Sequence, residues 1–287
     1  FFYRPGAKLY FLLMYSAFWL NQTVFHFVSL LLHSIVASLV FLLAKKVFRN
    51  LFLSVVTALL FLILSGYSEA VYWISATGFL FTASFSLASL LFYISWEEKK
   101  KKAYVIASFV CMVLSMVFHE LGIVTPLLIL LYKSIFLKTV RLPKIFLFPI
   151  PLYLIVRFLA RSHWLSGDYH YNFFKLPFNA VGNAFGYVSL TLLGPIAMPL
   201  NIALRNGLKD HIMVSVFIMV ILGLIIKLLY KNYHQHLNKE DRRIFLFGFF
   251  FFVISLLPFL GLGNMASRYS YLSSIGIVFI FVVILKQ

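Results

Sequence analysis

The chain has 287 residues, of which 62% are hydrophobic, 19% are aromatic and only 11% are charged. A soluble globular domain is about half apolar and a quarter charged, so this chain has too few charges to solvate its own surface. A soluble enzyme, a disordered protein and a secreted disulfide-linked domain are therefore excluded. The single cysteine, Cys111, lies in an apolar run and has no partner for a disulfide. The composition predicts a polytopic membrane protein.

A helix needs roughly 20 mostly apolar residues to cross the hydrocarbon core of a bilayer. On this criterion we predict an all-α fold, a transmembrane bundle of about nine spans that forms one domain over residues 1–287, with additional interfacial or re-entrant helices. The segment 7–20 is short and suits an interfacial helix as well as a span. The predicted spans are 23–44, 51–64, 78–95, 103–118, 121–136, 144–159, 212–230, 244–260 and 269–285.

The basic residues predict the orientation of the bundle. Four connections and the last residues hold 17 of the 25 lysines and arginines, and the positive-inside rule places them in the cytoplasm. This clustering between apolar runs also argues against a nucleic-acid partner, despite a net charge of +17. The basic residues concerned are Lys45, Lys46, Arg49, Lys99, Lys100, Lys101, Lys102, Lys133, Lys138, Arg141, Lys144, Lys227, Lys231, Lys239, Arg242, Arg243 and Lys286.

One long segment does not fit a single crossing. The span 144–159 leads outward and the span 212–230 must lead inward, so the apolar stretch 182–204 between them cannot cross once. Gly194-Pro195 and Pro199 also interrupt it. We therefore expect residues 160–211 to form an external excursion that contains a membrane-lying helix.

The eight acidic residues divide into two groups. Glu97, Glu98, Glu240 and Asp241 lie in the basic loops, where we expect solvated carboxylates that balance lysines. Glu69, Glu120, Asp168 and Asp210 lie on the outer side. Glu69 and Glu120 end apolar segments, and a carboxylate in that position faces either a cavity and a partner or water and lipid headgroups.

A few polar residues in or near the spans can be interpreted either as binding residues or as packing and lipid-contacting residues. Arg268 precedes Tyr269 and Tyr271, and an arginine at this level either binds a phosphate with two hydrogen bonds or reaches ordinary lipid headgroups. His26 and His33 share one helix face, and the pattern favours packing and hydrogen bonding over metal binding because no third ligand has suitable spacing. Thr82, Ser86 and Ser89 form a stripe typical of helix packing.

Four blocks of sequence, in the same order, resemble a family of membrane enzymes. Tyr3-Arg4-Pro5 with FHFVSLLLH at 25–33, SGYSEAVYWIS at 65–75, FHELGIVTPLLILLYKS at 118–134 and LLPFLGLGNMASRYSYLSSIG at 256–276 are similar to motifs of GT-C glycosyltransferases. The similarity is greatest to the protein O-mannosyltransferase-like group, including the membrane part of the tetratricopeptide-repeat O-mannosyltransferases. The chain is divergent, since Ser65-Gly66 replaces the family's His-Pro and His119 replaces its Lys.

The resemblance implies transfer of a sugar from a polyprenyl-phosphate carrier to an acceptor hydroxyl outside the cytoplasm. It implies that Arg268, Arg4 and Tyr271 bind the donor phosphate and that Glu69 and Glu120 support catalysis. His119, Trp73 and Tyr269 would line the cavity. In this family the catalytic acid lies in the first external loop, so we expect a first span, that loop and the general base upstream of Phe1.

Several alternatives stay open at this stage. A flippase for lipid-linked saccharides also needs a polar path and aromatic belts, and an inactive scaffold would tolerate the departures from the family pattern. The acceptor is a protein, a lipid or a glycan, and the surrounding partners are membrane lipids. The sequence assigns no cofactor and no set of metal ligands. Whether a divalent metal takes part in the reaction stays open. The absence of appended repeats favours the bacterial plasma membrane over the endoplasmic reticulum.

Overall fold

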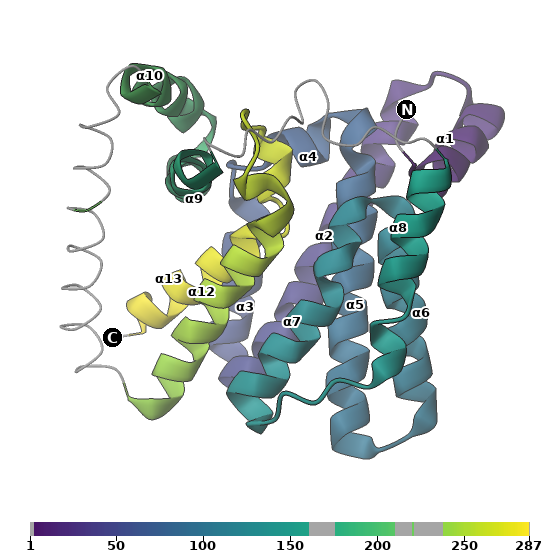
Figure 1. Ribbon diagram of the computed structural model, residues 1–287, viewed down its shortest axis with the longest axis vertical. Helices are drawn as coiled ribbons and strands as arrows, with labels where there is room; N and C mark the ends of the chain where they lie inside the picture. Colours follow the sequence, from purple (N-terminus) through teal and green to yellow (C-terminus); the bar gives the residue numbers. More distant parts are fainter. Residues whose placement is uncertain (1–2, 161–175, 210–219, 221–237, 287) are drawn as a thin grey trace.

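The computed structural model describes residues 3–160, 176–209, 220 and 238–286, and these residues form an all-helical bundle without a β-strand (Figure 1). Helices suit this sequence because a helix satisfies its own backbone hydrogen bonds, as an apolar bilayer requires. The longer helices are α1 (Pro5–Phe18), α2 (Gln22–Phe48), α3 (Leu51–Ile63), α5 (Thr77–Lys99), α6 (Lys102–Phe118), α8 (Pro149–Leu159), α9 (Leu176–Leu193), α10 (Ala197–Lys209), α12 (Lys239–Leu260) and α13 (Ser274–Leu285).

Short helical segments connect or extend the longer ones. Several of them carry the residues that the sequence singles out. They are α4 (Ser68–Tyr72), α7 (Thr125–Tyr132), the 3₁₀ turns η1 (Ile74–Ala76), η2 (Glu120–Val124), η4 (Lys144–Phe146), η7 (Gly194–Ile196) and η8 (Ser267–Ser270), and the π-helical turn η3 (Lys133–Leu137).

Five helical stretches of the described residues are long and apolar enough to cross a membrane, as expected of a membrane protein. Three shorter apolar helices are Leu51–Ile63, Lys102–Phe118 and Ser274–Leu285. The predicted span 212–230 lies almost entirely outside the described residues, and the predicted span 144–159 contains a helix of only 11 residues, α8. The five long stretches are Gln22–Phe48, Ile74–Lys99, Glu120–Leu137, Leu176–Ala203 and Lys239–Leu260.

Asparagine caps define where several helices begin. The side chains of Asn21, Asn50 and Asn238 accept hydrogen bonds from backbone N–H groups in the first turns of α2, α3 and α12. These bonds satisfy donors that have no partner inside the helix. Arg49 and Lys100 end α2 and α5 in the left-handed conformation, which allows the tight connections to α3 and α6.

The polar stripe on α5 packs helices together, as the sequence indicates. The Thr82 hydroxyl donates to the Ser115 carbonyl at 3.1 Å, and the Ser89 hydroxyl donates to the Ser108 carbonyl at 2.7 Å. Ser86 lies 2.8 Å from the hydroxyl of Thr125. Such small residues let helix backbones approach closely, so α5 forms the centre of a tight contact with α6 and α7.

The basic connections lie together at one end of the bundle. Figure 1 shows the α5–α6 turn, the α7–α8 connection and the start of α12 at its lower end, whereas α1, α4 and α10 lie at the upper end. We call these the basic end and the opposite end. The assignment of the basic end to the cytoplasm stays a prediction.

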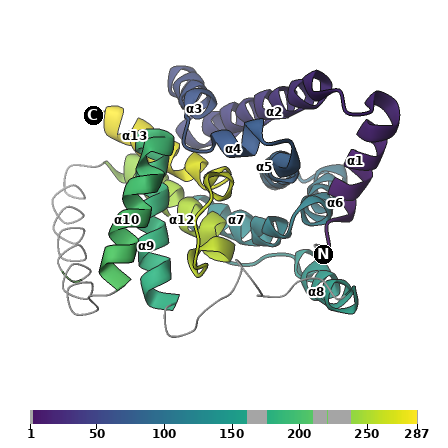
Figure 2. The ribbon, with the colours of Figure 1, turned by 90° about the horizontal axis from the view of Figure 1, so that it is seen from above.

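The described helices that follow α8, which are α9 and α10, run in a different direction. Figure 1 shows α9 end-on, and Figure 2 shows α9 and α10 along their length, so both cross the long helices at the opposite end. The break between them at Gly194, where φ is +73°, lies where the sequence predicts an interruption. The rest of the predicted excursion, including Asp168 and Asp210, lies outside the described residues.

One acidic residue of the basic end, Asp241, differs from the expectation of solvated carboxylates, and a second, Glu97, is partly exposed. Asp241 is buried, and Lys286 Nζ lies 2.7 Å from its Oδ1. Glu97 accepts from the buried Lys133 at 2.8 Å, and Lys133 also donates to the Tyr93 hydroxyl at 2.9 Å. The expectation was wrong for Asp241 because a lysine from the distant C-terminal helix reaches it. Both carboxylates nevertheless balance lysines, as predicted.

Candidate functional site

The residues that the sequence singles out gather in short segments at the opposite end of the bundle. Glu69 lies in the first turn of α4, Arg268 lies in η8, and Glu120 begins η2. These irregular segments join long apolar helices, where charged side chains can lie at the edge of the apolar layer. Two groups of residues result, which we call the Arg268 cluster (Glu69, Trp73, Arg268, Tyr269) and the Arg4 cluster (Arg4, His119, Glu120, Arg157).

The centre of the Arg268 cluster is an ion pair between Arg268 and Glu69. The guanidinium Nη1 donates to Oε1 of the carboxylate. The second carboxylate oxygen accepts from the Arg268 backbone N–H at 3.3 Å and from the Ser267 hydroxyl at 3.2 Å. Because backbone and side-chain donors share one carboxylate, Glu69 fixes the conformation of the η8 segment as well as the guanidinium.

Two aromatic rings flank the Arg268 guanidinium. Its Cζ atom lies 4.7 Å from the ring centroid of Trp73 and 4.8 Å from that of Tyr269. Tyr269 in turn stacks on Phe259, with centroids 4.3 Å apart and planes 2° from parallel. The ring faces stabilise the cation. Trp73 is 47% exposed, so this end of the cluster is accessible.

The Arg4 cluster contains one carboxylate and two arginines. Nε and Nη2 of Arg4 donate to the two oxygens of Glu120 at 2.8 and 2.7 Å, which is the two-pronged geometry that matches a guanidinium to a carboxylate. Arg157, at the end of α8, places Nη1 3.8 Å from the same carboxylate. Among the described residues, two guanidinium charges thus face one carboxylate.

His119 completes the Arg4 cluster as a buried residue, and its place at a cavity stays a prediction. It is only 1% exposed, and its ring packs on Phe79 with centroids 4.1 Å apart. Nδ1 accepts the backbone N–H of Leu121 at 3.1 Å, which assigns the remaining proton to Nε2. Burial, aided by the nearby Arg4 charge, lowers the pKa of His119 to about 3, so the ring is neutral near pH 7.

An aromatic layer connects the two clusters. Phe79, from the first turn of α5, packs on His119 and also on Tyr269, whose ring centroid is 5.9 Å away. The ring of Phe259 contacts both His119 and Tyr269. The Arg4–Glu120 and Glu69–Arg268 ion pairs are therefore linked by one group of packed aromatic rings. Both pairs lie at the opposite end of the bundle.

Tyr271 lies apart from both clusters. It is fully buried, and its hydroxyl lies 2.8 Å from Nδ1 of His33. Its ring packs edge-on against Tyr67 and Phe61, with centroids 5.0 and 5.6 Å apart. The interpretation of His33 as a packing and hydrogen-bonding residue is confirmed. Tyr271 belongs to the same core group, so we do not carry forward its predicted contact with a phosphate.

Sequence reasoning assigned the arginines and the carboxylates to different tasks and did not foresee that they pair. Arg157 was recognised only as one of several arginines at predicted outer edges, and it was given no role in the site. Among the residues that the structure describes, no group of three or more His, Cys, Asp or Glu side chains could hold a metal ion.

Comparisons of the chain with protein families, with curated proteins and with solved structures find no match.

Proposed function

We propose that this chain is a membrane glycosyltransferase of GT-C-like architecture, with about nine spans. It would transfer a sugar from a polyprenyl-phosphate carrier to a hydroxyl group on the side of the membrane away from the basic end. The observation that supports this most is the Arg268 cluster, where a partly exposed guanidinium is held by two aromatic rings and a carboxylate. The resemblance of four sequence blocks to GT-C enzymes supports it independently.

In the proposed donor site, the donor phosphate replaces the Glu69 carboxylate at the Arg268 guanidinium. In the described state Glu69 neutralises Arg268. A donor phosphate would bind the same guanidinium in place of the carboxylate, because the planar fork of an arginine can donate two hydrogen bonds to either group. Arg268 would then stabilise the negative charge that develops on the departing phosphate. Arg4, held by Glu120, would add to the positive potential at the same end of the bundle.

The proposed reaction exchanges one bond at the sugar. The bond between the anomeric carbon and the phosphate oxygen breaks, and the acceptor oxygen forms the new bond to that carbon. The acceptor proton passes to a general base, to which we assign no described residue, and polyprenyl phosphate leaves. Glu69, released from Arg268, would orient the acceptor hydroxyl.

The arrangement of charges favours a transferase over a flippase. A flippase needs a polar path through the bilayer, whereas both described arginine–carboxylate clusters lie at the opposite end of the bundle. A transferase needs its polar residues at one face only. An inactive scaffold would also accommodate the clusters, and the activity measurement below separates it from a transferase.

The test is transfer of a labelled sugar by the intact protein in lipid vesicles, with polyprenyl-phosphate mannose and polyprenyl-phosphate glucose as donors. We expect Arg268→Gln to lower the rate by about 10²-fold or more, as removal of a charge-stabilising donor does in other enzymes. Arg141→Gln is the control, because Arg141 is an exposed arginine of a basic connection. Equal rates for Arg268→Gln and the wild type, or no transfer to any acceptor class, would overturn the proposal.

A further inference from the structure

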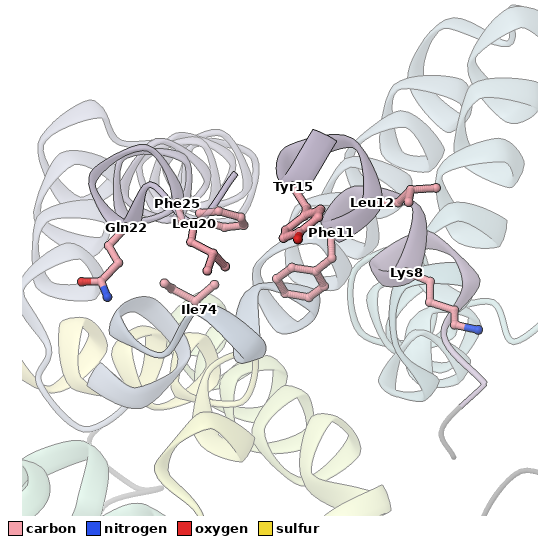
Figure 3. A pocket seen from close by; sticks show the side chains of 8 residues that line it. All are labelled: Lys8, Phe11, Leu12, Tyr15, Leu20, Gln22, Phe25 and Ile74. Atoms are coloured by element: carbon pink, nitrogen blue, oxygen red, sulfur yellow. The ribbon is translucent and has the colours of Figure 1, made fainter. Parts of the chain in front are cut away.

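An open groove separates α1 from the start of α2. It has a volume of about 620 Å³, and Phe11 and Tyr15 of α1 form one wall. Leu20, Phe25 and Ile74 form the other wall, with side chains that point into the gap (Figure 3). The lining is almost entirely apolar, so the groove suits a hydrocarbon chain and not a polar ligand.

The other face of α1 is attached to the bundle. Gly6 packs so closely on α6 that an added Cβ would lie 3.0 Å from a methyl group of Val117, and the Tyr10 ring packs edge-on against Phe81. Leu9 and Leu13 of α1 are more than half exposed. A helix with one attached face and one exposed apolar face is typical of an interfacial helix, which lies at the level of lipid headgroups and the first part of the acyl chains.

The positive charge of Lys8 favours a hydrocarbon ligand that carries a negative charge. Lys8 is the charged residue that lines the groove, and it lies one turn after Arg4 on the same helix. The sequence of α1 contains no acidic residue. An ammonium group at the edge of an apolar groove is complementary to a phosphate that carries a hydrocarbon chain, which is the chemistry of an anionic lipid.

We propose that an anionic bilayer phospholipid binds here, with one acyl chain in the groove and its phosphate near Lys8. The bilayer is the source we favour because the groove opens beside the exposed leucines of α1, where lipid covers the protein. The bound chain would fill the space between α1 and α2 and hold α1 in place. Because α1 follows directly on Arg4, the lipid would also stabilise the Arg4–Glu120 pair. This site is independent of the proposed transfer reaction.

Native mass spectrometry of the purified full chain tests the site. The protein is freed of lipid in detergent and then given phosphatidylglycerol or phosphatidylcholine of equal chain length. We expect one phosphatidylglycerol to be retained in preference to phosphatidylcholine. Lys8→Gln should lower that preference about five-fold, the typical effect of one lysine near an anionic lipid surface.

A second pair of variants tests the groove itself. Leu20→Trp should fill the groove and abolish retention of the lipid, whereas Leu13→Trp should leave retention unchanged. The two leucines are 66% and 59% exposed, so both variants should fold, and Leu13 does not line the groove. Equal retention in Leu20→Trp and Leu13→Trp would overturn the proposal. Displacement of phosphatidylglycerol by an equimolar amount of farnesyl phosphate would also overturn it, because the groove would then belong to the isoprenoid donor.

Discussion

Arg4 and Glu120, which are 116 positions apart in the sequence, form a two-pronged ion pair at the opposite end of the bundle, with nitrogen–oxygen distances of 2.8 and 2.7 Å. The pair joins the start of α1 to the η2 segment that precedes α7. Both side chains are about one-fifth exposed, so solvent screens the pair only in part. Helix α1 is thereby held by an interaction between two residues for which the family resemblance implied separate roles.

Replacement of Arg4 should destabilise the protein because Glu120 would keep a largely buried charge beside only one arginine. We expect Arg4→Gln to lower the free energy of unfolding by about 2 kcal/mol. Arg4→Lys should recover less than half of that loss, since an ammonium group cannot make the two parallel hydrogen bonds. Thermal unfolding in detergent measures both variants. A stability of Arg4→Lys equal to that of the wild type would show that the two-pronged geometry has no energetic role.

The Lys133–Glu97 pair at the basic end should be sensitive to the loss of one partner. Lys133 is only 6% exposed, so Glu97→Gln leaves a buried charge without its counter-ion and should cost about 3 kcal/mol. The double variant Glu97→Gln/Lys133→Met should be more stable than Glu97→Gln alone. Glu98→Gln is the matched control, because the Lys46–Glu98 pair is exposed and should change stability by less than about 0.5 kcal/mol. A similar loss for both glutamates would contradict the importance of burial.

Close contact between α12 and α13 depends on glycine. A Cβ atom on Gly276 would lie 2.6 Å from the backbone nitrogen of Phe252 and would also strike the Gly248 carbonyl. Gly276→Ala should therefore destabilise the bundle by about 1–3 kcal/mol. Gly182 is also helical but has open space around it, so Gly182→Ala should be neutral or stabilising by up to about 1 kcal/mol. Chemical or thermal unfolding should show a loss of stability for Gly276→Ala and no loss for Gly182→Ala, and a similar loss in both variants would refute this packing.

The burial of His119 should make stability depend on pH. Its pKa is about 3 in the folded protein, below the ordinary value of about 6.5 in an unfolded chain. As the pH falls, the unfolded state therefore binds a proton at His119 before the folded state does. The free energy of unfolding then decreases between pH 6.5 and pH 3, by at most about 1.4 kcal/mol per pH unit. His119→Gln should reduce this slope. Thermal midpoints between pH 7.5 and 4 provide the measurement, and an identical slope in both proteins would exclude His119 as the cause.

The positions of most helices follow from the apolar pattern, but some of their ends do not. The predicted span 244–260 begins at Lys239 in the structure, because the Asn238 cap stabilises a polar first turn that hydropathy does not detect. In the predicted span 144–159, Pro149 and Pro151 lack backbone N–H donors, and α8 begins only at Pro149. The sequence therefore predicts the end of a helix well only where the apolar residues extend to that end.

The pairing of the site residues could not be derived from local pattern. Glu69 and Arg268 are 199 positions apart, and helix periodicity relates only residues within a few turns of one another. Their positions at the edges of apolar segments identified Glu69 and Arg268 as candidate site residues, but only tertiary packing brings the two together. The family resemblance implied a phosphate contact for Tyr271, but Arg268 faces the cluster, whereas Tyr271 turns into the core beside His33.

Binding of farnesyl phosphate, a short isoprenoid phosphate, to the purified full chain tests the proposed donor site most directly. Titration calorimetry of the wild type, Arg268→Gln and Glu69→Gln gives the affinities. We predict that Arg268→Gln weakens binding by about ten-fold or more, since a charged hydrogen-bond donor to the phosphate is lost. Glu69→Gln should strengthen binding, because its carboxylate no longer competes for the guanidinium. Wild-type affinity in Arg268→Gln, or weaker binding in Glu69→Gln, would contradict a phosphate site at Arg268.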